Sequence, residues 1–294
     1  MSLDIDRIHK SIKRVAKFLK KSPKHPTPEK IHDVRTSTRR LESTLDTLKL
    51  GKPRKRLQRE LPRLRKRCGN VRDMDVLTGL AISVEAQGDD KDCLVQVIEY
   101  LGAQRAKQAK KLRTLAKQRG PSIRRNLTRL STKVDRLAES RKSNPSSVDT
   151  ENASALADVA AKLRFPEKLS KRNLHPYRLQ IKELRYVLQL SEMQNQPDLL
   201  STLGEVKDAI GEWHDWEELV VIASDLLDDG PQASLVQQLK KIANDKFEHA
   251  LAVTNRMRST YIDGKRRKTK SPRAKSKGRS IPFPVSLARS AMQA

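Results

Sequence analysis

The sequence predicts an all-α protein made of two related helical segments. Apolar residues recur at intervals of three and four, and only a helix brings that spacing onto one face. The first such run is Ile5, Ile8, Ile12, Val15 and Leu19. Stretches that alternate apolar and polar residues, as half-buried strands do, are missing. Histidine and arginine also return with one spacing in both halves of the chain, which indicates a tandem duplication of a small helical bundle.

In the first half, proline and glycine mark the ends of the expected helices. Thr27 and Pro28 are typical of a helix start, because the hydroxyl can cap a free N–H group and proline needs no N–H partner in the first turn. Gly69 and the Gly120-Pro121 pair are interpreted as breaks. The expected helices span residues 3–21, 28–51, 53–69, 72–88, 90–118 and 121–141.

In the second half, helices are expected at residues 153–163, 174–193, 198–210 with a continuation to 227, and 232–261. The polar segment 142–152 has no apolar face and is the predicted linker. Residues 265–279 contain nine Lys and Arg and no acidic residue, which is too little apolar content to fold. The predicted domains are therefore a first repeat at 1–141, the linker, a second repeat at 153–263 and a basic disordered tail at 264–294.

Composition indicates an anionic partner. The net charge is +27 and the pI is near 10.3, and a field of that sign attracts nucleic acid, anionic membrane or polyphosphate. Aromatic residues make up only 3% of the chain, which argues against modules that stack single-stranded bases. Two cysteines without metal-like spacing favour a reduced, cytoplasmic protein. Neither a membrane-length apolar run nor a signal peptide is recognisable, so no membrane partner is expected.

The most informative stretch begins at His32, where Arg35 and Arg39 follow at helical intervals. It returns 143 positions later as His175, Arg178 and Lys182. These residues lie one position from the expected core stripe, about 100° around the helix, so we expect them at the edge of the buried face. A second block returns at an offset of 142, with Gly69, Arg72, Asp73 and Asp75 matching Gly211, His214, Asp215 and Glu217.

These four blocks resemble the CHAD family (conserved histidine α-helical domain). They read HDVRTSTRRLESTL, CGNVRDMDVL, HPYRLQIKELRYVLQL and IGEWHDWEEL. The resemblance implies two tandem four-helix bundles related by a pseudo-twofold axis. It also implies a basic central pore or groove between the bundles that binds inorganic polyphosphate, and association with polyphosphate granules.

Polyphosphate carries a charge on every unit and no bases, so it needs many cationic donors along a path. Arginine suits this need because its planar fork donates two hydrogen bonds to one phosphate. Histidine adds a donor whose charge varies near neutral pH, so we expect tighter binding near pH 6 than near pH 8. The predicted polyphosphate-binding residues are His32, Arg35, Arg39, Arg40, Arg65, Arg72, His175, Arg178, Lys182, Arg185, Tyr186, Lys207 and His214.

The two basic stripes, which are the helical runs of basic residues that begin at His32 and at His175, are not equivalent. Glu42 stands where the second repeat has Arg185, and Glu183 stands opposite Arg40. Neither glutamate is assigned to the ligand. Pro176 is tolerable in a first helical turn, although it can turn His175 differently from His32.

Other chemistry-bearing residues have plainer interpretations. The acidic residues after Gly69 and Gly211 could be acid/base or metal groups, but capping of amides or pairing with arginines is favoured. Trp213 and Trp216 are expected to pack in the core rather than wall a ligand site. Three histidines, His9, His25 and His249, are interpreted as surface residues. Cys68 and Cys93 are expected to be buried or inert thiols.

No catalytic arrangement is recognisable, since the chain has no Walker-type loop, no Cys/His metal set and no glycine-elbow serine. We therefore expect a binding protein, not an enzyme, without metal or cofactor. The alternative is a nucleic-acid-binding basic helical protein. A scaffold that binds an acidic protein surface is the third possibility.

Overall fold

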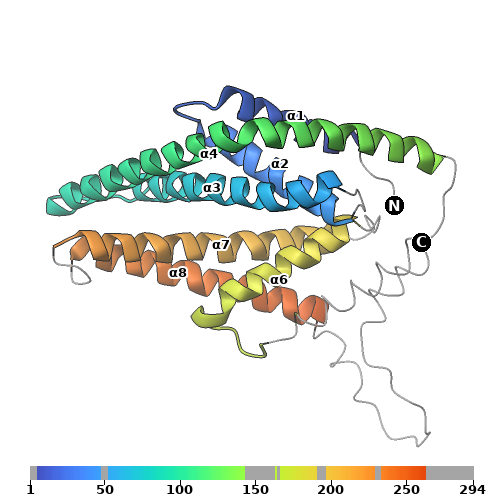
Figure 1. The fold of residues 1–294 in the computed structure, drawn as a ribbon. Helices are drawn as coiled ribbons and strands as arrows, with labels where there is room; N and C mark the ends of the chain where they lie inside the picture. Colours follow the sequence, from blue (N-terminus) through green and yellow to red (C-terminus); the bar gives the residue numbers. More distant parts are fainter. Residues whose placement is uncertain are drawn as a thin grey trace, which may run out of the picture. The chain divides into compact units, whose positions relative to one another are not determined.

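The computed structural model describes residues 5–47, 52–142, 163, 166–190, 197–228 and 233–262. Within these ranges the regular elements are all helices (Figure 1), which confirms the all-α prediction. They are α1 (Ile5–Lys21), α2 (Pro28–Thr47), α3 (Lys52–Ile82), α4 (Asp89–Lys142), α6 (Lys171–Leu190), α7 (Pro197–Leu226), α8 (Ser234–Met257) and a π-helical turn at Arg258–Ile262. The predicted linker, the tail and most of the helix expected at 153–163 lie outside the described residues.

The helices belong to two compact units. One comprises residues 3–145 and 222–235, and the other comprises 1–2, 146–221 and 236–294. They are called here the α1–α4 unit and the α6–α8 unit. Each has an apolar core of its own, one drawn from positions 8–134 and the other from positions 163–262.

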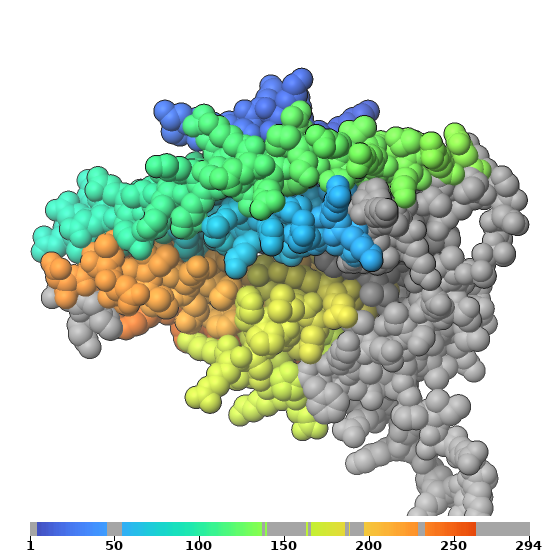
Figure 2. Space-filling model, viewed as in Figure 1, coloured from blue at the N-terminus to red at the C-terminus, as the bar shows by residue number. Residues whose placement is uncertain are grey.

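In the α1–α4 unit, α3 and α4 form a long antiparallel hairpin (Figure 1). Gly88 closes the turn between them with a φ of 56°, a left-handed conformation that glycine adopts without strain. Helices α1 and α2 pack against the hairpin, and α1 lies against α4 (Figure 2). The core residues follow the predicted helical spacing, since Ile31, Val34 and Leu41 of α2 are all buried.

Two predicted helix breaks are wrong, because α3 runs without interruption past Gly69 and α4 runs past Gly120 and Pro121. In both cases the apolar face continues through the glycine. Leu64, Cys68 and Val71 are fully buried around Gly69, and this burial outweighs the loss of about 1 kcal/mol that glycine causes within a helix. In α4, the missing side chain of Gly120 lets the backbone of Leu19 approach to 3.5 Å from the position of a Cβ atom.

Aromatic residues pack in the interior of the α6–α8 unit. Tyr177 of α6 is fully buried and its hydroxyl donates a hydrogen bond to the carbonyl oxygen of Leu163 over 3.0 Å. Trp213 of α7 packs on Phe247 of α8 with ring centroids 5.5 Å apart. Trp213 and Trp216 are both buried, so the interpretation of these tryptophans as core residues is confirmed.

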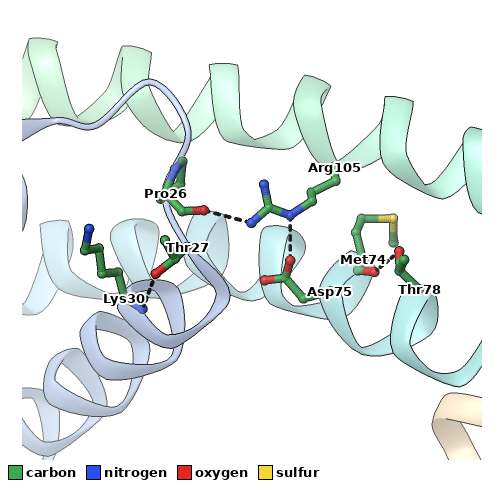
Figure 3. Close-up of polar contacts among 7 residues, drawn as sticks. All are labelled: Pro26, Thr27, Lys30, Met74, Asp75, Thr78 and Arg105. Atoms are coloured by element: carbon green, nitrogen blue, oxygen red, sulfur yellow. Dashed lines mark hydrogen bonds and ion pairs between the residues drawn. The ribbon is translucent and has the colours of Figure 1, made fainter. Parts of the chain in front are cut away.

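One arginine joins three segments of the α1–α4 unit. Arg105 of α4 donates from Nε to Asp75 of α3 over 2.5 Å and from Nη2 to the carbonyl oxygen of Pro26 over 2.8 Å (Figure 3). The Asp75 side chain is only 4% exposed. Since Pro26 precedes α2, this contact fixes the start of the helix that carries His32 and Arg35.

We predict that Arg105→Ala lowers the free energy of unfolding by about 3 kcal/mol, because it leaves the buried Asp75 carboxylate without its cation. Urea denaturation followed by circular dichroism measures the change. The double variant Arg105→Ala, Asp75→Ala should recover part of the loss. A change below about 0.5 kcal/mol in the single variant would show that the ion pair does not support the fold.

Candidate polyanion-binding clusters

The α6–α8 unit brings most of its predicted residues together on α6 and α7. The residues described there, called the α6–α7 cluster, are His175, Arg178, Lys182, Arg185, Lys207 and His214, and all six are half-buried. The imidazole rings of His175 and His214 lie 4.2 Å apart between centroids and are tilted by 50°. Residues from two helices and from both sequence blocks therefore meet here. The side chain of Tyr186 lies outside the described part.

Arg178 lies flat against α7. Its Nε atom donates a hydrogen bond to the carbonyl oxygen of Lys207 over 3.0 Å. A Cβ atom at Gly211 would come within 2.2 Å of its Nη2 atom, so this guanidinium position requires glycine. The absence of a side chain at Gly211, in the IGEWHDWEEL block, therefore makes room for the guanidinium of Arg178 from the HPYRLQIKELRYVLQL block.

A looser contact between an arginine and a glycine occurs two helical turns away. A Cβ atom at Gly204 would lie 3.7 Å from the guanidinium carbon of Arg185. Arg178 and Arg185 are seven residues apart on α6, and Gly211 and Gly204 are seven residues apart on the antiparallel α7. Gly204 was not singled out from the sequence, although its spacing from Gly211 matches the spacing of the two arginines.

The α1–α4 unit repeats the first of these contacts. Arg35 of α2 lies beside Gly69 of α3, with its Nε atom 3.6 Å from the position of a Cβ atom. The pair corresponds to Arg178 and Gly211 at offsets of 143 and 142. The predicted residues described here, called the α2–α3 cluster, are His32, Arg35, Arg39, Arg40, Arg65 and Arg72. His32 is exposed and the five arginines are half-buried.

The second contact is not repeated. Glu42, at the position of Arg185, accepts hydrogen bonds from Nε of Arg65 over 3.0 and 2.9 Å. One of the predicted ligand cations is therefore already neutralised by a carboxylate of its own unit. In the α6–α7 cluster, Arg185 stands at the position of Glu42 and Lys207 stands at the position of Arg65. Lys207 has its own partner in Asp208, at 2.5 Å, but that carboxylate is 72% exposed.

The acidic residues of the second block act locally. Asp75 pairs with Arg105, and Glu217 accepts hydrogen bonds from Lys171 over 3.1 Å and from the Trp213 indole over 3.3 Å. Pairing with an arginine is therefore confirmed for Asp75, whereas the cation paired with Glu217 is a lysine. Helix capping is wrong, because both lie in the middle of continuous helices. Within the described ranges, no three His, Cys, Asp or Glu residues form a group that could hold a metal ion.

Lys171 extends the α6–α7 cluster beyond the predicted residues. Its ammonium group lies 5.4 Å from the centre of the Phe247 ring, a distance at which a cation is attracted to the aromatic face. It also lines a hollow of about 550 Å³ together with Glu217, Lys240 and Lys241. Lys171 lies one turn before His175, a helical spacing that could have indicated it.

The predictions for the three lone histidines and for Cys68 have different outcomes. His9 is not an isolated surface residue, because its ring nitrogens lie 2.8 Å from Asp135 and 2.9 Å from Ser131 and so join α1 to α4. His25 and His249 are exposed as expected. Cys68 is fully buried, and burial raises the pKa of its thiol to about 12, which makes it an inert thiol as predicted.

Burial lowers the pKa of both paired histidines. For His175, the neighbouring His214, Arg178 and Lys182 lower the pKa further. For His214, Arg178 and Lys182 also lower the pKa, while Glu217 opposes them. Both rings are therefore neutral at pH 7, and they take up protons only below the usual value of about 6.5.

We predict that polyanion affinity rises as pH falls from 8 to 5.5, by up to about tenfold per pH unit for each proton taken up. Bound phosphate favours the imidazolium form, and the lowered pKa values place most of the rise below pH 6.5. Titration at fixed ionic strength measures it. The double variant His175→Gln, His214→Gln should flatten the curve, whereas His249→Gln should not. Equal affinity at both pH values would remove the histidine pair from the ligand contacts.

Comparison with known protein families identifies the family of this chain. The family model described as CHAD domain matches residues 8–251, which include both histidine blocks and both glycine blocks. No curated protein and no solved structure matches the chain. No helix in the described part is long and apolar enough to cross a membrane.

Proposed function

Since this chain belongs to the CHAD domain family, we propose that it binds inorganic polyphosphate and catalyses no reaction. The observation that carries the proposal is the arginine seated on a glycine in each unit, Arg35 on Gly69 and Arg178 on Gly211. A half-buried guanidinium held against a neighbouring helix has little rotamer freedom to lose when phosphate binds.

The chemistry of the clusters favours phosphate over carboxylate or apolar ligands. Arginine, lysine and histidine donors follow one another at helical intervals, so a chain with one charge per unit can contact several of them in sequence. Partial burial strengthens each contact, because charges are screened less at the edge of a core than in open solvent. The catalytic groups of a phosphatase or kinase are absent from both sequence motifs.

The finer arrangement is also part of the proposal. The stripes that begin at His32 and His175 line opposite sides of a basic pore between two bundles related by a pseudo-twofold axis. The protein is proposed to be cytoplasmic and to associate with polyphosphate granules. The family resemblance supports these points.

We predict that replacing four stripe residues, Arg35, Arg39, Arg178 and Lys182, with alanine weakens binding of long-chain polyphosphate more than about 100-fold, because several charge-assisted contacts are lost. Isothermal titration calorimetry measures the affinity, and circular dichroism checks the fold. The matched control replaces four exposed cations elsewhere, Lys24, Lys55, Arg56 and Lys91. Equal losses in both variants would mean that only net charge matters.

Competition separates this function from its alternatives. Duplex DNA or RNA at equal phosphate concentration should not displace long-chain polyphosphate from the wild-type chain. Displacement would favour the nucleic-acid-binding alternative for these clusters. A scaffold for an acidic protein would keep its partner after the four alanine substitutions.

We also predict that Glu42→Gln tightens polyphosphate binding about threefold, because it releases Arg65 from its carboxylate and removes one repelling charge. Glu99→Gln, an exposed change of the same charge on α4, is the control. A gain no larger than that of the control would show that Arg65 does not reach the ligand.

A further inference from the structure

The long helix α4 contains a segment with cations and no acids. Between Leu101 and Val134 there are eleven Lys and Arg and no Asp or Glu. They are Arg105, Lys107, Lys110, Lys111, Arg113, Lys117, Arg119, Arg124, Arg125, Arg129 and Lys133. None of them belongs to the two clusters described above, so the polyphosphate proposal leaves this segment unexplained.

Most of these cations lie on the side of α4 that faces solvent. Seven are exposed, and six of these share one side of the helix, called here the outer α4 face: Lys107, Lys110, Lys111, Lys117, Arg125 and Arg129. The opposite side supplies Leu112, Ala116, Ile123 and Leu127 to the core. Figure 2 shows α4 open along much of its length on the face drawn.

The outer α4 face is long and continuous. From Lys107 to Arg129 the helix rises 1.5 Å per residue, or roughly 33 Å in all. It does not end at Pro121, because the buried face carries on through Gly120. Helix α1, which packs against α4, carries the exposed cations Lys13 and Lys17. The result is a strip of exposed cations on a helix whose other side is packed in the core.

We propose that the outer α4 face is a second polyanion surface, which binds the phosphate backbone of a duplex nucleic acid without reading its sequence. A duplex offers one charge per about 1.7 Å of axis, and one of its turns spans about 34 Å, close to the length of the strip. Lysine and arginine contacts to phosphate position a duplex but do not distinguish bases.

The outer α4 face suits a different ligand from the α2–α3 and α6–α7 clusters. A rigid duplex pays little conformational entropy to lie along a straight helix, whereas flexible polyphosphate must be ordered along a surface that offers no half-buried histidine or glycine-seated arginine. A membrane is disfavoured, because interfacial helices insert an apolar face. The apolar face of α4 is already packed in the core, and its described residues from 101 to 136 include no exposed large apolar side chain.

The test uses the full chain with Lys110→Gln, Lys117→Gln, Arg125→Gln and Arg129→Gln combined. The control is the glutamine version of the four exposed cations used above, Lys24, Lys55, Arg56 and Lys91, which changes net charge equally. Fluorescence anisotropy with a 30-base-pair duplex is recorded over a range of salt concentrations. The α4 variant should bind more than about tenfold more weakly at low salt, and its log–log salt slope should be shallower by about 3 to 4.

Three other results would overturn the proposal. The first is a duplex affinity and salt slope like those of the control variant. The second is a loss of polyphosphate binding in the α4 variant as large as its loss of duplex binding, since the outer α4 face would then belong to the polyphosphate site. The third is an unchanged duplex affinity with lost binding to vesicles of phosphatidylserine and phosphatidylcholine, which would identify a membrane surface.

Discussion

In both clusters an arginine lies against a glycine of the next helix, and in the α6–α7 cluster the position of that arginine depends on the glycine. At Gly211 any side chain would overlap the guanidinium of Arg178, since a Cβ atom would come within 2.2 Å of it. The glycine therefore lets a cation lie at the edge of a core, where a β-carbon would push it outward. The carbonyl oxygen of Lys207 holds it there, and His175 and His214 meet one turn away in sequence on each helix.

The two units share this contact but differ in the residues around it. Arg35 and Gly69 keep the contact, but Glu42 replaces the second arginine and takes Arg65 as its partner. The α6–α7 cluster instead seats a second arginine on Gly204. One unit therefore has an internal ion pair where the other has a cation, so the two units differ in charge at this position.

The sequence predicted the helices and the stripes because both follow the helical repeat. It failed at Gly69 and Gly120, where local preference for a break is worth about 1 kcal/mol per residue and the burial of several apolar neighbours outweighs it. It also missed Gly204, the His9 contacts and the Arg65 pairing, because these join positions whose proximity only tertiary packing determines. The sequence shows a glutamate at position 42 where the second repeat has Arg185, but it does not show that Arg65 is the partner of Glu42.

The most direct measurement compares polyphosphate affinity of Gly211→Ala with that of Gly79→Ala, where a Cβ atom would meet nothing within 4 Å. Alanine favours a helix over glycine by about 1 kcal/mol, so neither variant should unfold. If the seated arginine organises the site, Gly211→Ala weakens binding more than about fivefold and Gly79→Ala leaves it unchanged. Equal affinities in two stably folded variants would contradict the account.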